Sequence, residues 1–90
     1  MTEIELLADD TLNHVFAPAV TQIEPGTTIT WHFRDVDEDG QLVAHNVVFD
    51  DQASPVQTTG AFSRTFTEPG TYQYVCTLHP FMEGAVIVTE

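Results

Sequence analysis

Every strongly patterned segment of this chain alternates apolar and polar residues with a period of two. In residues 28–33, for example, Ile29, Trp31 and Phe33 alternate with threonines and a histidine. The other segments with this pattern are residues 3–6, 62–66, 71–76 and 85–89. Because side chains two residues apart face the same side of a β-strand, the pattern predicts half-buried strands. No segment carries an apolar stripe at helical spacing, so the fold is expected to be all-β.

Turn-forming residues divide this pattern into short pieces. Glu24-Pro25-Gly26 and Glu68-Pro69-Gly70 each precede a β-rich run, as turns that lead into strands do. Pro18 interrupts residues 14–23, which are therefore expected to form at best an edge strand. About seven short strands in a chain of this length indicate a two-sheet antiparallel sandwich that folds as a single domain.

The charge of the chain is strongly negative. It has fourteen acidic residues, two arginines and no lysine, for a net charge of −12. Nucleic acid is excluded as a partner, because binding it requires clustered positive charge, and anionic membrane surfaces are disfavoured. Two interpretations of the acidity stay open: a basic protein partner, or a halophilic setting in which salt screens the self-repulsion. No apolar run approaches the ~20 residues of a membrane span.

One acidic segment matches the opening of a calcium-binding EF-hand loop. Asp35-Val-Asp37-Glu-Asp39-Gly40 has the acidic spacing and the glycine of that motif. The twelfth position is Asn46 rather than glutamate, and residues 28–33 and 42–49 are expected to be strands rather than helices. The segment is therefore predicted to be a solvated acidic hairpin loop, and whether it binds any cation is left open.

A second segment carries ligands of a different kind. Cys76, His79 and Met82 bring a thiolate, an imidazole and a thioether together within seven residues, and such soft or borderline ligands favour copper. A single cysteine excludes both an internal disulfide and a site with several thiolates. His45 shares its parity with Val47 and Phe49, so it is expected to face the interior. A buried imidazole needs a partner there, and a metal would supply one.

Together these segments resemble the cupredoxins, the small type 1 blue copper proteins. The resemblance rests on His45-Asn-Val-Val-Phe followed by Cys76-x2-His79-x2-Met82, and it extends over almost the whole chain, through Phe16-x-Pro18, Ile23 to Trp31 and Gly70-Thr-Tyr72-x-Tyr74. The ligand loop is most similar to that of amicyanins, and the chain overall is plastocyanin- and halocyanin-like. The resemblance implies a Greek-key antiparallel β-sandwich of about seven to eight strands, with residues 1–90 as one copper-binding domain.

The resemblance also implies the role of each ligand. His45, Cys76 and His79 are the expected equatorial ligands of one Cu(I)/Cu(II) ion, and Met82 is the long axial ligand.

Further residues are expected around this ligand set. By the same resemblance, Asn46 braces the ligand loop near Cys76. Leu78 stands where amicyanins have proline, so its N–H can donate to the thiolate. The residues expected to surround the copper ligands are Asn46, Thr77 and Leu78. The residues expected to form a small apolar docking surface around His79 are Pro18, Pro80 and Phe81.

The predicted function is that of an electron carrier rather than an enzyme. It would pass single electrons between redox protein partners with basic docking surfaces, as a monomer. The alternative is a periplasmic copper chaperone or storage domain with the same ligands. A copper enzyme would need a further histidine-rich site, which His14 and His32 alone do not supply. The expected location is periplasmic or otherwise extracytoplasmic, for a mature domain without its signal or anchor, while a cytosolic location stays open.

Overall fold

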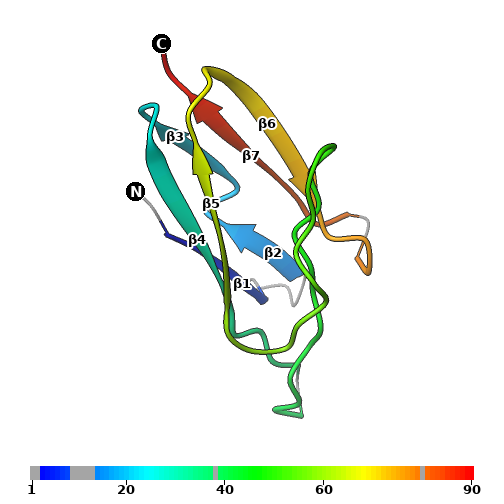
Figure 1. The fold of residues 1–90 in the computed structure, drawn as a ribbon. Helices are drawn as coiled ribbons and strands as arrows, with labels where there is room; N and C mark the ends of the chain where they lie inside the picture. Colours follow the sequence, from blue (N-terminus) through cyan, green and yellow to red (C-terminus); the bar gives the residue numbers. More distant parts are fainter. Residues whose placement is uncertain (1–2, 9–13, 38, 80) are drawn as a thin grey trace.

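The computed structural model describes residues 3–8, 14–37, 39–79 and 81–90, and these form seven β-strands and no helix. The strands are β1 (Glu3–Ala8), β2 (His14–Ala17), β3 (Val20–Ile23), β4 (Thr27–Phe33), β5 (Ala61–Phe66), β6 (Gly70–Val75) and β7 (Glu83–Val88). One sheet has the order β2-β1-β4-β5 and the other the order β3-β7-β6 (Figure 1). The predicted all-β sandwich of two sheets is confirmed.

The strand directions differ from the prediction. Sequential neighbours β1 and β2, β4 and β5, and β6 and β7 pair antiparallel, as predicted. However, β1 pairs parallel with β4, and β3 pairs parallel with β7. The sheets are therefore mixed rather than purely antiparallel. The physical reason is that the chain leaves the first sheet to form β3 in the other sheet before it returns as β4, and alternation alone does not encode such a crossover.

Proline divides the segment that was predicted to be an edge strand. Residues 14–23 form two strands, β2 and β3, separated by Pro18 and Ala19. β2 lies at the edge of one sheet and β3 at the edge of the other, so the chain crosses between the layers at this point. The Ala17–Pro18 peptide bond is cis. The edge prediction is confirmed for both strands, and the break is the crossover between the two sheets.

The core lies between the sheets and has the predicted parity. Ile29, Trp31 and Phe33 of β4 are buried, and Ile4 and Leu6 of β1 are buried beside them. Trp31 is ringed by aromatic side chains, with ring centroids 5.4 to 6.4 Å away, from Phe49, Phe62, Phe66 and Tyr74. Each fully buried side chain of this size contributes about 1.5–3 kcal/mol of transfer free energy. This core fixes the position of the strand ends that carry the candidate site.

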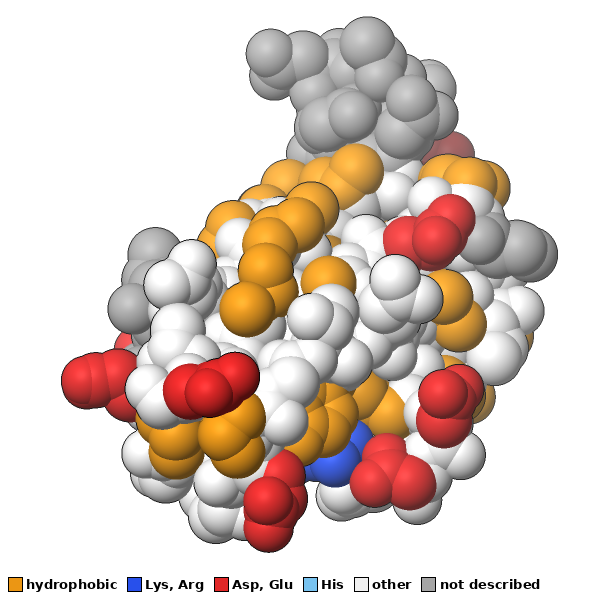
Figure 2. All heavy atoms as spheres, turned by 90° about the horizontal axis from the view of Figure 1, so that it is seen from above, with side chains coloured by type: hydrophobic (Ala, Val, Ile, Leu, Met, Phe, Trp, Pro, Cys, Tyr) orange, Lys and Arg blue, Asp and Glu red, His pale blue; other side chains and the backbone are white. Residues whose placement is uncertain are grey.

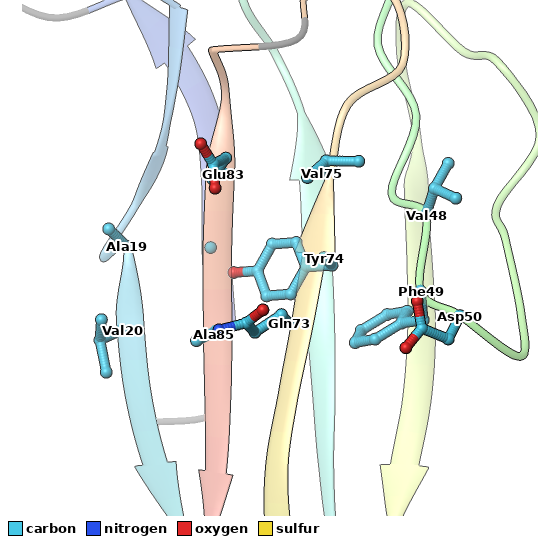
Figure 3. Close-up of a pocket in the computed structure, with 11 residues that line it drawn as sticks. Ala19, Val20, Val48, Phe49, Asp50, Gln73, Tyr74, Val75, Glu83 and Ala85 are labelled. Carbon is cyan, nitrogen blue, oxygen red and sulfur yellow. The ribbon is translucent and has the colours of Figure 1, made fainter.

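Tyr74 packs across the neighbouring strand. Its ring extends from β6 toward β7 (Figure 3), where Gly84 leaves the space that it occupies. A Cβ atom at position 84 would lie 2.3 Å from Tyr74 Cζ, so only glycine allows this contact. Burial raises the pKa of Tyr74 to about 12, which keeps the phenol protonated.

The segment between β4 and β5 is irregular. Residues 42–49 were predicted to form a strand, but the structure shows only isolated bridges, from Val36 to Leu42, His45 to Gln57, and Val48 to both Ala53 and Val75. The prediction of a strand is therefore wrong. The alternation of apolar and polar residues in this segment arises because the segment is held against the core at separate points. The segment does not run along a neighbouring strand.

The acidic residues are spread over the surface. Figure 2 shows Asp and Glu side chains dispersed around the face seen from above, with one small basic patch. Both arginines face carboxylates: Arg34 lies 3.5 Å from Glu5, and Arg64 binds Asp51 through two hydrogen bonds of 3.0 and 3.1 Å. The described part of the chain contains no helix able to cross a bilayer.

Candidate metal centre

The loop between β6 and β7 carries three of the four predicted ligands. Cys76 directly follows β6 and Met82 directly precedes β7, so the two residues stand at the neck of a loop that joins antiparallel neighbours. The amide of Cys76 donates to the carbonyl of Met82 at 3.0 Å, and the amide of Met82 donates to the carbonyl of His79 at 2.8 Å. These bonds close the loop and hold its ends in a fixed relation.

His45 approaches the loop from the irregular segment. Its backbone exchanges two hydrogen bonds with Gln57, of 3.0 and 2.9 Å. Val48 exchanges a similar pair with Val75, the last residue of β6 and the neighbour of Cys76. His45 is fully buried, as its parity with Val47 and Phe49 predicted. The contact with Val75 thus brings the segment of His45 to the strand that ends at Cys76.

The side chains of these three residues converge. Cys76 Sγ lies 3.6 Å from His45 Nδ1 and 3.7 Å from His79 Nδ1, and the three atoms all lie within 4.8 Å of one another. Atoms bound to one small ion at about 2.0–2.3 Å are about 3.3–4.0 Å apart in trigonal or tetrahedral geometry. The observed separations therefore match a shared metal ion, and a sulfur with two imidazoles is the donor set that suits copper.

Met82 lies at the same end of the sandwich. Its side chain is buried and belongs to the hydrophobic core, next to the loop neck that its backbone closes. Its role as the axial ligand stays a prediction.

The surroundings of both imidazoles favour the neutral form, which is the form that binds a metal. Burial lowers the pKa of His45 below its usual 6.5, and this effect outweighs the hydrogen bond to Asp35, which acts in the opposite direction. Burial also lowers the pKa of His79, with a further contribution from the nearby His45. Because a metal binds the neutral imidazole, both shifts favour metal binding near neutral pH.

Asp35 is the residue whose predicted position is wrong. It was expected in a solvated loop, but its carboxylate is 1% exposed and lies beside the candidate centre. Its Oδ2 atom is 2.8 Å from His45 Nε2 and 2.5 Å from His14 Nδ1. Asp35 continues the inward parity of Trp31 and Phe33 beyond the end of β4, and this was the sequence signal that could have placed it.

The rest of that acidic segment is a turn. Asp37 Oδ1 accepts the amides of Asp39 and Gln41, each at 2.9 Å, and Gly40 has a φ of 80°, which favours glycine. The predicted acidic hairpin loop therefore consists of these residues, without Asp35. Since the first carboxylate of the calcium motif is directed to histidines, the match to that motif is one of sequence only.

His14 is the second residue that the sequence did not indicate. It was given no role, yet its ring centroid lies 4.5 Å from that of His79 and 5.4 Å from that of His45. No pattern around position 14 signals this contact, because it depends on the position of β2 at the edge of its sheet, where it pairs with β1. His32 lies away from this group and binds Glu3 at 2.8 Å.

Asn46 connects the segment of His45 to the ligand loop. Its Oδ1 accepts the amide of Thr77 and its Nδ2 donates to Thr77 Oγ1, both at 2.9 Å. Within the described residues, the hydrogen-bonding contacts of Cys76 Sγ are to the rings of His45 and His79, and the Leu78 amide is not among them. The part of Leu78 in tuning the thiolate stays a prediction.

Of the predicted docking residues, the structure places Phe81 beside His79. Phe81 is 61% exposed and its ring centroid lies 6.1 Å from that of the partly exposed His79. Leu78 is also exposed on this loop. Pro18 is exposed in the crossover after β2, and its place in a docking surface stays a prediction. Pro80 lies outside the described residues.

Comparison with known proteins gives one consistent family. Residues 2–89 match the family described as copper binding proteins, plastocyanin/azurin family. The chain is 38% identical over 74 residues to an amicyanin of Paracoccus denitrificans, and the aligned region covers 73% of this chain and 52% of that protein. It is 39% identical over 82 residues to a halocyanin of Natronomonas pharaonis, and the aligned region covers 81% of this chain and 47% of that protein.

A solved structure matches over the full length. It is described as a novel purple cupredoxin from Nitrosopumilus maritimus, with a TM-score of 0.79 and 30% identity, and the match covers 99% of this chain and 100% of that one. The chain spans about half the length of the named amicyanin and halocyanin relatives.

Proposed function

Because the chain belongs to the copper-binding proteins of the plastocyanin/azurin family, we propose that it is a type 1 copper electron carrier rather than an enzyme. In this proposal His45, Cys76 and His79 are the equatorial ligands of one copper ion, and Met82 is the axial ligand. The observation that carries the proposal is the separation of 3.6 and 3.7 Å between the Cys76 sulfur and the two imidazole nitrogens.

The arrangement of the ligand set supports electron transfer. Cys76 Sγ already lies at separations from both imidazole nitrogens that a shared ion requires, and hydrogen bonds close the loop that carries Cys76 and His79. A donor set that suits both Cu(II) and Cu(I) and is assembled in advance needs little rearrangement when an electron arrives. These features serve a carrier.

The alternative of a copper chaperone or storage domain is less well supported. Delivery of a metal requires an incoming ligand to reach the ion and replace a donor. Cys76 and His45 are both fully buried, so an incoming thiol would meet only the partly exposed His79. Slow copper loss to a mild chelator is expected of the carrier, and rapid loss would favour the chaperone.

The proposed route for the electron is His79. It is the most exposed of the proposed ligands, and the exposed Phe81 and Leu78 lie on the same loop. A small apolar surface suits the weak, transient contacts of redox partners. Exposed acidic side chains elsewhere on the surface would steer a basic partner through longer-range attraction. Asp50 is better suited to this than Asp51, whose carboxylate is bound to Arg64.

We also propose the setting in which the carrier works. Residues 1–90 would act as a single copper-binding domain in an extracytoplasmic compartment, as a monomer that meets larger redox proteins. These parts of the proposal rest on the family and on the acidic surface.

The test compares docking and steering variants. Phe81→Asp should slow electron transfer to a basic cytochrome at every ionic strength, because it places a charge in the apolar contact. Thr71→Asp is the control, since Thr71 is also exposed but lies near the start of β6, at the end of the strand away from Cys76. Asp50→Asn should slow transfer mainly at low salt, through the association rate. Stopped-flow rates that are unchanged by Phe81→Asp would show that electrons do not pass through His79.

A further inference from the structure

A buried carboxylate connects the candidate centre to a second histidine. Asp35 Oδ2 lies within hydrogen-bonding distance of both His45 Nε2, at 2.8 Å, and His14 Nδ1, at 2.5 Å. A carboxylate only accepts hydrogen bonds, so both ring nitrogens donate. The other carboxylate oxygen, Oδ1, is buried and has no hydrogen-bond partner among the described residues.

The hydrogen bond to Asp35 determines which nitrogen of His45 is free. With Nε2 donating its proton to the carboxylate, the lone pair of the neutral ring resides on Nδ1. That nitrogen is the one that faces Cys76 Sγ at 3.6 Å. Carboxylate–histidine–metal arrangements of this kind fix ring orientation and make the ring nitrogen a stronger donor.

The buried charge also needs compensation. Placing a carboxylate in the interior is unfavourable unless hydrogen bonds or a positive charge offset it. The two arginines do not supply this charge, because Arg34 faces Glu5 and Arg64 binds Asp51. A Cu(II) ion with one thiolate and neutral imidazoles has a net positive charge, whereas the same site with Cu(I) is neutral. The carboxylate is therefore better compensated in the oxidised state.

We propose that Asp35 is a positioning residue for His45, and that its carboxylate lowers the reduction potential of the centre by favouring Cu(II). This inference rests on the proposed copper site. His14 secures the carboxylate from the other side and packs against His79, with ring centroids 4.5 Å apart. His14 and Asp35 thus form one connected group with the two proposed histidine ligands, His45 and His79.

The first test measures the potential of the copper protein at a fixed pH. Asp35→Asn keeps an oxygen that can accept from His45 but removes the charge, and it should raise the potential. Loss of such outer groups typically changes metal affinity 10–100-fold. A tenfold loss that affects Cu(II) alone corresponds to about 59 mV for one electron. Asp35→Ala, which removes the acceptor as well, should raise the potential and also broaden the visible band as His45 loses its fixed orientation.

The matched control is Glu68→Gln. It makes the same change of charge in the exposed turn before β6, and the length of this strand separates it from Cys76 by roughly 20 Å. The control should leave the potential close to that of the wild type. A potential that moves no further in Asp35→Asn than in Glu68→Gln overturns the inference.

The second test needs no variant and no oxidised copper. In the apo and Cu(I) proteins, long-range 1H–15N spectra should show His45 protonated at Nε2, with that proton protected from exchange with water. His45 protonated at Nδ1 in the apo protein would overturn the positioning role. A wild-type protein that binds copper without intense visible absorption would instead refute the proposed function, so the two failures can be told apart.

Discussion

The contact between Asn46 and Thr77 gives the most specific prediction for stability. It joins the irregular segment to the ligand loop through two hydrogen bonds of 2.9 Å. Each such bond contributes about 0.5–1.5 kcal/mol, and Asn46→Ala also leaves the Thr77 amide without its partner. We expect this variant to lower the free energy of unfolding of the apo protein by about 2–3 kcal/mol, a large part of the roughly 5–15 kcal/mol typical of a domain.

A milder variant isolates one of the two bonds. Thr77→Ala removes only the hydroxyl that accepts from Asn46 Nδ2, so it should cost about 1 kcal/mol. In the Asn46→Ala background, Thr77→Ala should cost almost nothing further, because the partner of the hydroxyl is already absent.

Urea unfolding measures these differences directly. Fluorescence of the single, fully buried Trp31 reports the transition of the apo protein. Thr28→Ala serves as the control, since it removes a hydroxyl pair at 2.6 Å with Thr65 on the exposed face of the sheet. If Asn46→Ala unfolds within about 0.5 kcal/mol of the wild type, less than a single bond would account for, the two bonds do not fix the loop and the reasoning is refuted.

Three further predictions concern the apo protein. Gly84→Ala should destabilise it by about 1–3 kcal/mol in urea unfolding, because the new Cβ would overlap the Tyr74 ring; a wild-type midpoint would contradict the packing. The lowered pKa values of His45 and His79 mean that the folded state binds fewer protons than the unfolded state. Their contribution to stability is therefore present above about pH 6.5 and is lost as the pH falls toward the folded pKa values. A double His45→Gln, His79→Gln variant should lose this pH dependence, and an unchanged slope would refute it. Molar sodium chloride should raise the midpoint by screening the charge of −12, and melting curves that do not depend on salt would count against the halophilic interpretation.

Local patterns in the sequence predicted what depends on local geometry. Parity placed Trp31 in the core and His45 in the interior, and both are fully buried. The spacing of Cys76 and His79 within one loop predicted that they could share an ion with His45, and the structure brings these three side chains together. For Trp31 a strand, and for Cys76 and His79 a short loop, determines where the side chain points, so the pattern is sufficient. His45 faces inward although its segment is held only by isolated bridges.

Contacts between distant segments could not be predicted in this way. The parallel pairing of β1 with β4 depends on a crossover between sheets. The contact of His14 with His79 depends on where β2 lies at the edge of its sheet. Asp35 was assigned to a solvated acidic loop because the acidic spacing was given more weight than its inward parity. These residues lie close to the proposed ligands, so the surroundings of the centre were less predictable than the ligands themselves.

The most direct test of a type 1 copper site is the visible absorption of the copper-loaded protein and of its Cys76→Ser variant. The wild type should bind one copper ion and show intense visible absorption from charge transfer between the Cys76 sulfur and Cu(II). The serine oxygen cannot supply this transition, so the variant should be colourless at the same copper content. A Cys76→Ser protein that keeps the intense band, or a wild type that binds copper without it, would contradict the assignment.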